Sequence, residues 1–187
     1  MTLSWEQTAE RLNHAEKLLN QTRSVSVSGP LHAGIDLGTA DVVVMVLNDA
    51  DFPVAAFLEW AEVVRDGVVV DFIGAVDIVK DLVKKAEKRL GVKLTEASTS
   101  FPPGTDARLS TNILETAGLD VTAVRDEPSC VASLLELDRA AVVDVGGGTT
   151  GTAVVQKGSV VFSDDEPSGG RHITLSIAGH FDISLEE

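Results

Sequence analysis

Two short segments of this chain repeat one pattern, and the repeat constrains the fold more than any other feature. In each, an apolar run ends in a single aspartate and continues within two residues into glycine and then threonine. The segments are Ala33–Thr39, with Asp36, and Ala141–Thr152, with Asp144. An aspartate offers oxygen to a hard cation, and glycines let backbone N–H groups approach an anion closely. Two such elements, far apart in the chain, predict two lobes that meet around a metal-bound phosphate group.

The first segment predicts a strand that ends near Asp36 and a turn that follows it. Gly38 and Thr39 reverse the chain, and their N–H groups with the Thr39 hydroxyl can hold phosphate oxygens. An ordinary hairpin turn explains the same residues, and both interpretations stay open at this point.

The second segment contains three consecutive glycines, Gly146, Gly147 and Gly148, followed by Thr149. Ordering three glycines is costly because each loses extra backbone freedom on folding, and a plain hairpin needs only one or two. This run therefore favours close approach to a ligand.

The same segment formally fits a dinucleotide-binding fingerprint. Gly146, Gly148 and Gly151 have the required spacing, and Asp164 or Asp165 lies at about the right distance downstream. That fingerprint must join a strand to a helix, whereas the β-branched residues of 152–156 predict a second strand. We therefore reject the dinucleotide interpretation.

The N-terminal residues 1–30 are predicted to form a helix over 3–20 and a linker. Trp5, Ala9, Leu12, Ala15 and Leu19 fall near one face of this helix. The helix either packs on the body of the protein through that face or serves as a detachable docking peptide.

Residues 31–138 alternate between strand and helix patterns, as expected for one complete lobe. Three strands are followed by helix, strand, helix, strand and helix, which predicts a mixed five-stranded sheet with helices on its faces. The predicted strands cover 31–37, 42–47, 54–64, 94–100 and 121–124, a turn is expected at 65–67 before the apolar 68–72, and the helices cover 73–90, 106–117 and 129–137, with Pro128 as a first helical residue.

Residues 139–187 restart the opening pattern and form a second, partial lobe. Strands are expected over 140–145, 152–156 and 160–163, followed by a helical pattern over 169–179. Gly169 and Gly170 could bring the N-terminus of this helix onto phosphate. The alternating units that would complete a sheet like the first are missing.

Charge and composition restrict the partners. The chain has 29 acidic and 15 basic residues, a net charge of −14, which disfavours nucleic-acid binding. It contains no apolar run long enough for a membrane helix and no signal-peptide pattern. The single cysteine, Cys130, excludes an internal disulfide and fits a cytoplasmic location.

Glu127 lies between the two repeated segments, directly before Pro128. Its position fits an acidic residue at a helix start, and it equally fits a residue at the crossing between lobes that orients an attacking water.

Together these motifs resemble the actin-like ATPase superfamily, which includes sugar kinases, Hsp70 chaperones and actin. Asp36–Thr39 resembles the first phosphate motif of the superfamily, and Asp144–Thr149 resembles the second. Glu127-Pro128 resembles the segment that connects the two domains, and Gly169-Gly170 resembles a glycine pair that approaches the phosphates. The resemblance implies an α/β, ribonuclease-H-like actin/Hsp70 ATPase fold with a complete first domain and an incomplete second one.

Longer stretches, such as Trp60–Gly67 and Thr99–Asp106, resemble the EutJ family of ethanolamine-utilisation proteins. That resemblance implies a cytoplasmic, ATP-binding, Hsp70-like chaperone or reactivating factor for enzymes of a bacterial microcompartment. One alternative is a non-catalytic scaffold that recruits enzymes or shell proteins, and another is a small-molecule kinase, ranked last because the first lobe has no long insertion.

The resemblance also implies roles for single residues. Asp36 and Asp144 would hold Mg²⁺ through its water shell, Glu127 would position water, and Lys80 is a candidate for the basic residue that many relatives place near the terminal phosphate. The β- and γ-phosphates of ATP would lie on Gly38, Thr39, Gly146, Gly147, Gly148 and Thr149, with Gly169 and Gly170 close by.

The family continues well beyond Glu187, into an adenosine-binding motif. We therefore expect this chain alone to hydrolyse ATP poorly or not at all. We also expect it to form homodimers through residues 140–187, because an unfinished sheet leaves strand edges and apolar faces uncovered.

Overall fold

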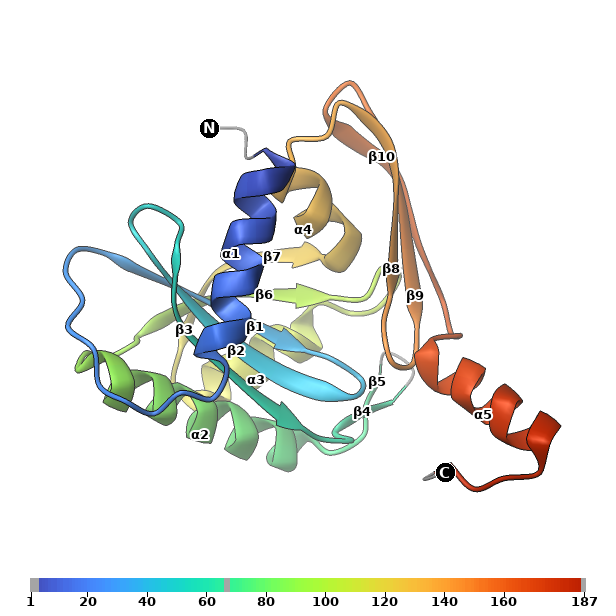
Figure 1. Ribbon diagram of the computed structural model, residues 1–187, viewed down its shortest axis with the longest axis horizontal. Coiled ribbons are helices and arrows are strands. Elements are labelled where there is room, and N and C mark those ends of the chain that lie inside the picture. The colour runs from blue at the N-terminus through green and yellow to red at the C-terminus, as the bar shows by residue number, and fades with distance from the viewer. Residues whose placement is uncertain (1–3, 66–67, 186–187) are drawn as a thin grey trace.

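A five-stranded sheet and a three-stranded sheet form the two lobes of the chain, and helix α4 (Glu127–Leu134) lies between them (Figure 1). The computed structural model describes residues 4–65 and 68–185. No helix within these residues is long and apolar enough to cross a membrane.

The sheet of the first lobe is mixed and five-stranded, as predicted, and its strand order is β3-β2-β1-β6-β7. The first three strands form an antiparallel meander, whereas β6 and β7 run parallel to β1. Alternate residues of β2, Val42, Val44 and Val46, are fully buried, which is the pattern of a strand with one face on the core. The strands are β1 (Leu31–Leu37), β2 (Asp41–Asn48), β3 (Pro53–Trp60), β6 (Glu96–Phe101) and β7 (Asp120–Asp126).

Helices α2 (Phe72–Leu90) and α3 (Arg108–Ala117) pack against each other and against this sheet. The backbone N–H of Gly74 donates to the Asp71 carboxylate at the start of α2, and Gly91 ends it with φ +69°. A short hairpin of β4 (Val64–Arg65) and β5 (Val68–Val69) precedes α2. The turn expected between them falls on Asp66 and Gly67, outside the described residues.

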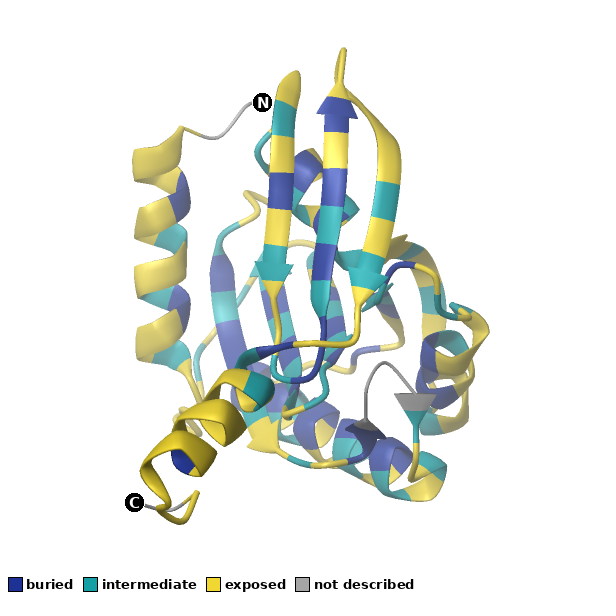
Figure 2. Cartoon of the chain, turned by 90° about the vertical axis from the view of Figure 1, so that its right-hand side faces the viewer, coloured by how far each residue is buried: buried dark blue, intermediate teal, exposed yellow. Residues whose placement is uncertain are grey.

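The second lobe is an antiparallel meander of β8 (Arg139–Val145), β9 (Thr150–Gln156) and β10 (Ser159–Glu166), followed by α5 (Gly170–Phe181). Its apolar core is small: among the described residues it consists of Val142, Ala153 and Val155, which pack with Ala132 of α4. Apolar side chains stay exposed over β10 and α5, and α5 extends away from the body (Figure 2). The strand that follows the glycine run confirms the rejection of the dinucleotide fingerprint.

Helix α1 (Trp5–Leu18) packs on β3 through a face that shares Ala15 with the predicted one but is otherwise shifted around the helix. Thr8 and Ala15 are buried, whereas Trp5 and Leu12 are 73% and 61% exposed. Small side chains at positions 8 and 15 let the helix approach the strand closely, which the larger apolar residues would prevent. Of the predicted face, Ala15 is therefore buried, whereas Trp5 and Leu12 point to solvent.

The linker after α1 is fixed by Arg89 of α2, a basic residue that is 5% exposed. Its guanidinium donates hydrogen bonds to the backbone carbonyls of Val54, Gln21 and Arg23, at 3.2, 3.1 and 2.8 Å. The structure therefore favours the packed arrangement of the N-terminal helix over a detached one.

Helix α4 begins two residues earlier than predicted and ends at Leu134. Asp126 is its N-cap, since its carboxylate accepts from the Ser129 N–H at 3.1 Å, and Pro128 therefore occupies the second helical position. The same carboxylate accepts a 3.1 Å bond from the Ser163 hydroxyl of β10. Asp126 thus joins the helix start to the second lobe.

Candidate functional site

The two repeated aspartates occupy equivalent places in the two lobes. Asp36 and Asp144 are each the last but one residue of a seven-residue strand, β1 and β8. Both line a cavity of about 440 Å³ between the lobes, together with Glu127 at the start of α4. Its other lining residues are Leu37, Gly38, Thr39, Ala40, Asp41, Trp60, Pro102, Val145, Gly146, Gly147 and Thr149.

The loops that follow the two aspartates pack directly on one another. A Cβ added to Gly148 would meet Thr39 Cγ2 at 2.6 Å, and one added to Gly147 would meet Ala40 Cβ at 3.0 Å. Real Cβ atoms essentially never come as close as the first distance. A larger residue at position 148 would therefore have to displace the Thr39 side chain, so this loop-to-loop contact favours glycine there.

Several backbone amides of these loops are available to a ligand. The glycine loop closes with a 2.9 Å bond from the Gly146 N–H to the Thr149 carbonyl. The amides of Gly147, Gly148 and Thr149 have no acceptor among the described residues, and the same holds for Gly38 and Thr39. Such unpaired N–H groups in a turn are suited to anion binding.

Asp36 is positioned by a neighbour on the adjacent parallel strand. The Ser100 hydroxyl of β6 donates a 2.5 Å hydrogen bond to Oδ1 of Asp36. This contact fixes one carboxylate oxygen and leaves the other for the cavity. A hydroxyl-oriented carboxylate is a common arrangement around bound metal ions.

Burial and mutual repulsion raise the pKa values of carboxyl groups in the cavity. Burial, with the charges of Asp36, Asp144, Asp165 and Asp126 adding to it, raises the pKa of Glu127 to about 8. Burial and the charge of Asp36 also raise the pKa of Asp144. Glu127 is therefore largely protonated at neutral pH until a cation enters.

Two further acids belong to this cluster that the motif analysis had not assigned to it. Burial and the charge of Asp36 raise the pKa of Asp41, the first residue of β2. Burial also raises the pKa of Asp165 on β10, and the Thr149 hydroxyl opposes this rise. Oδ1 of Asp165 is buried without a hydrogen-bond partner. The sequence motifs had connected Asp165 only with the rejected dinucleotide fingerprint.

Gly169 and Gly170 hold the glycine loop from behind and do not line the cavity. The Gly170 N–H donates to the Gly146 carbonyl and the Arg171 N–H to the Gly147 carbonyl, both at 2.9 Å. The Gly169 N–H donates to Nδ1 of His172 at 3.1 Å. The Gly169 amide is therefore bound to an imidazole nitrogen and the Gly170 amide to a carbonyl, so neither is free for the phosphate that the sequence had suggested.

Lys80 does not lie near the proposed phosphate site. It is on α2 and lines neither this cavity nor the second cavity beside it, which contains Arg171. Across the described part of the chain, no three His, Cys, Asp or Glu side chains converge tightly enough to coordinate an ion directly. Asp36 and Asp144 fit a cation held through water, which stays a prediction.

Comparisons with known proteins agree with this geometry. No family model matches the chain. It is 56% identical to the ethanolamine utilization protein EutJ of Escherichia coli strain K12 over 177 residues, 95% of this chain and 63% of that protein. It is also 32% identical to the chaperone protein DnaK of Thermus thermophilus over 111 residues, 55% of this chain and 18% of that protein. The chain thus spans less than two thirds of the EutJ relative.

Solved structures show the same fold. The crystal structure of EutJ from Carboxydothermus hydrogenoformans superimposes with a TM-score of 0.85 and 42% identity, covering 95% of this chain and 66% of that one. The structure of MreB5 of Spiroplasma citri bound to ADP matches with a TM-score of 0.63 and 20% identity, covering 83% of this chain and 59% of that one. The second likeness supports the predicted actin-like fold alone.

Proposed function

Since this chain is a homologue of EutJ along 95% of its length and has the fold of the actin-like ATPases, we propose that it forms the phosphate-binding core of an ATP-binding chaperone or reactivating factor. Its clients would be enzymes of an ethanolamine-utilisation microcompartment in the bacterial cytoplasm. The observation that carries the nucleotide assignment is the direct packing of two loops, each led by an aspartate, around one acidic cavity.

The residues of the cavity fit Mg²⁺ with a phosphate chain. Asp36 and Asp144 line the cavity and offer carboxylate oxygens to a cation. Asp165 does not line the cavity, but its buried Oδ1 has no hydrogen-bond partner, which a cation's water could supply. The free amides of Gly38, Thr39 and residues 147–149 would hold phosphate oxygens. Bound Mg²⁺ would offset the negative charge, and Glu127 would hold a water near the phosphate.

Calorimetric titration of this chain with Mg-ATP measures whether it binds the nucleotide, and so tests the nucleotide assignment. Client protection is tested separately by heating an ethanolamine-utilisation enzyme with this protein and Mg-ATP. We expect residual client activity to exceed that with the Asp144→Asn variant. Equal protection by both proteins would contradict a nucleotide-driven chaperone.

A scaffold function is the second candidate, and the outward face of α1 favours it. Trp5 and Leu12 are exposed there, beside the buried Thr8 and Ala15. The double variant Trp5→Ser with Leu12→Ser should keep α1 packed and abolish compartment association if α1 recruits partners. Unchanged association would exclude this face as the docking surface.

We also propose self-association through the second lobe. Phe162 of β10, with Ile173 and Phe181 of α5, is more than half exposed, which leaves apolar surface for a second copy. Light scattering should detect a dimer that Phe162→Ser with Ile173→Ser converts to monomer. A monomeric wild type at high concentration would contradict this proposal.

A further inference from the structure

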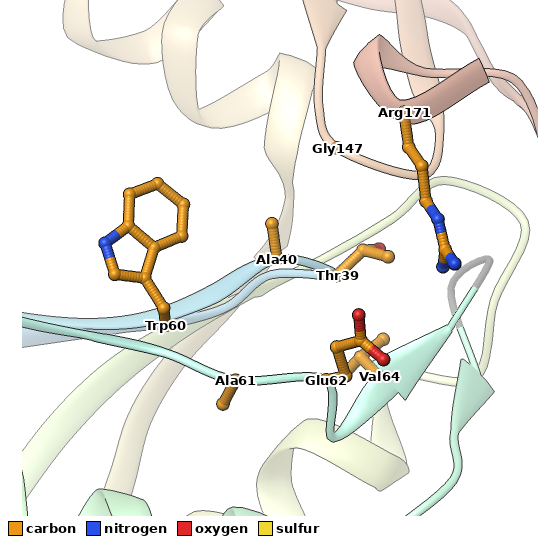
Figure 3. A pocket seen from close by; sticks show the side chains of 8 residues that line it. All are labelled: Thr39, Ala40, Trp60, Ala61, Glu62, Val64, Gly147 and Arg171. Carbon is orange, nitrogen blue, oxygen red and sulfur yellow. The ribbon is translucent and has the colours of Figure 1, made fainter. Parts of the chain in front are cut away.

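A second cavity adjoins the acidic one and contains a basic side chain. Its volume is about 420 Å³, and it shares Thr39, Ala40, Trp60 and Gly147 with the first cavity. The residues that belong to it alone are Ala61, Glu62, Val64 and Arg171 (Figure 3). The two spaces therefore meet at the loop-to-loop contact and can be filled by one ligand.

Arg171 is attached firmly to the glycine loop. Its N–H donates to the Gly147 carbonyl, and the preceding Gly170 N–H donates to the Gly146 carbonyl. A Cβ added to Gly169 would meet the Gly146 carbonyl oxygen at 2.6 Å, so this end of α5 lies as close to the loop as backbone allows. The backbone of Arg171 is consequently fixed against the site, while its exposed side chain is free to move.

The guanidinium reaches from the second lobe across the cavity toward the segment of Glu62 and Val64 in the first lobe (Figure 3). It makes no ion pair or side-chain hydrogen bond within residues 4–65 and 68–185. Among the described side chains that line either cavity it is the one basic group, against Asp36, Asp41, Glu62, Glu127 and Asp144.

We propose that Arg171 binds a phosphate oxygen of the ligand, on the side of the glycine loop away from the paired aspartates. This inference rests on the proposed nucleotide function and adds its phosphate-contacting cation. The two cavities together are lined by five carboxyl groups, which repel a phosphate chain, and one Mg²⁺ offsets only part of that repulsion. The planar guanidinium can bond two phosphate oxygens, and these charge-assisted bonds are strong.

The test is calorimetric titration of this chain with Mg-ATP and, separately, with Mg²⁺ alone. Arg171→Gln should weaken Mg-ATP binding about 10-fold or more, and Arg171→Lys should restore part of the affinity. Binding of Mg²⁺ alone should not weaken, because no anion is involved. Arg139→Gln removes the same charge from the opposite end of β8 and should bind Mg-ATP as the wild type does.

Three results would overturn the inference. If Asp144→Asn weakens Mg-ATP binding while Arg171→Gln does not, the nucleotide site stands and the role of Arg171 is wrong. If Arg171→Gln and Arg139→Gln lose equal affinity, the effect is one of net charge. If the wild-type chain does not bind Mg-ATP, both this inference and the proposed nucleotide function are wrong.

Discussion

The Ser100 hydroxyl donates a 2.5 Å hydrogen bond to Oδ1 of Asp36, so one strand of the first lobe orients the acid carried by its neighbour. This bond crosses from β6 to β1 at the ends that face the second lobe. It holds the carboxylate in one direction before any ligand is present. Asp144 has no equivalent bond among the described residues.

Removing this hydroxyl should therefore weaken ligand binding without unfolding the protein. Ser100→Ala is expected to raise the Kd for Mg-ATP about 10-fold, the effect of losing one hydrogen bond to a charged group. Ser98→Ala, on the same strand, is the control, because Ser98 bonds to Thr122 away from the site. Equal Kd values for Ser100→Ala and the wild type would show that Asp36 needs no such support.

The contact between Gly148 and Thr39 predicts a steric effect. Gly148→Ala should lower the free energy of unfolding by about 1–3 kcal/mol, because the new Cβ would overlap Thr39 Cγ2 and push the two loops apart. Gly34→Ala is the matched control, since an added Cβ there meets nothing within 4 Å. Denaturant unfolding that gives the same loss for both variants would contradict the loop-to-loop packing.

Stability should fall as pH rises, because the pKa of Glu127 is raised to about 8 from an ordinary 4.5. Between these two pH values the folded state keeps a proton on Glu127 that the unfolded state has lost. The stabilisation from this proton is complete below about pH 4.5 and is lost as the pH rises to about 8. Partial exposure screens the effect to the order of a few kcal/mol at most. Thermal unfolding at pH 5.5 and 8 should show this slope in the absence of Mg²⁺.

Glu127→Gln should flatten that slope, since the amide does not titrate. Glu10→Gln is a control on the exposed surface of α1 and should leave the slope unchanged. A slope that survives in Glu127→Gln would assign the titration to other groups.

The packing of α1 depends on Arg89, and its loss should be measurable. Arg89→Met leaves the carbonyls of Val54, Gln21 and Arg23 without their donor and should cost about 2–4 kcal/mol of unfolding free energy. Limited proteolysis should then cleave within residues 20–30 faster than in Lys88→Met, which changes an exposed neighbour. Equal cleavage rates would show that α1 is held by other contacts.

Much of the fold could be predicted because strand and helix patterns are local. The alternation in β2 and the spacing in α2 identify their elements directly. The face of α1 was predicted correctly only at Ala15, because hydrophobicity alone ranks Trp5 above Thr8, whereas close approach to β3 selects small side chains. Local patterns report which residues are apolar, and long-range packing decides which are covered.

The acids and glycines of the site were predictable from their repeated spacing. Arg171, Ser100 and Asp165 were not, because the part of each depends on contacts between segments that are distant in the sequence. A signal for Arg171 existed in its position directly after Gly169 and Gly170, which bring the helix start onto the glycine loop. The role of that glycine pair differs from the predicted one, because its two amides donate to His172 Nδ1 and to the Gly146 carbonyl.

Calorimetric titration with ATP, with and without Mg²⁺, across Asp36→Asn, Asp144→Asn and the double variant tests the shared site most directly. We predict that the wild type binds ATP only in the presence of Mg²⁺. Each single variant should bind Mg-ATP about 10-fold or more weakly, and the affinity of the double variant should be little lower than that of either single variant. Mg-ATP binding by either single variant with wild-type affinity would contradict a site built from both lobes.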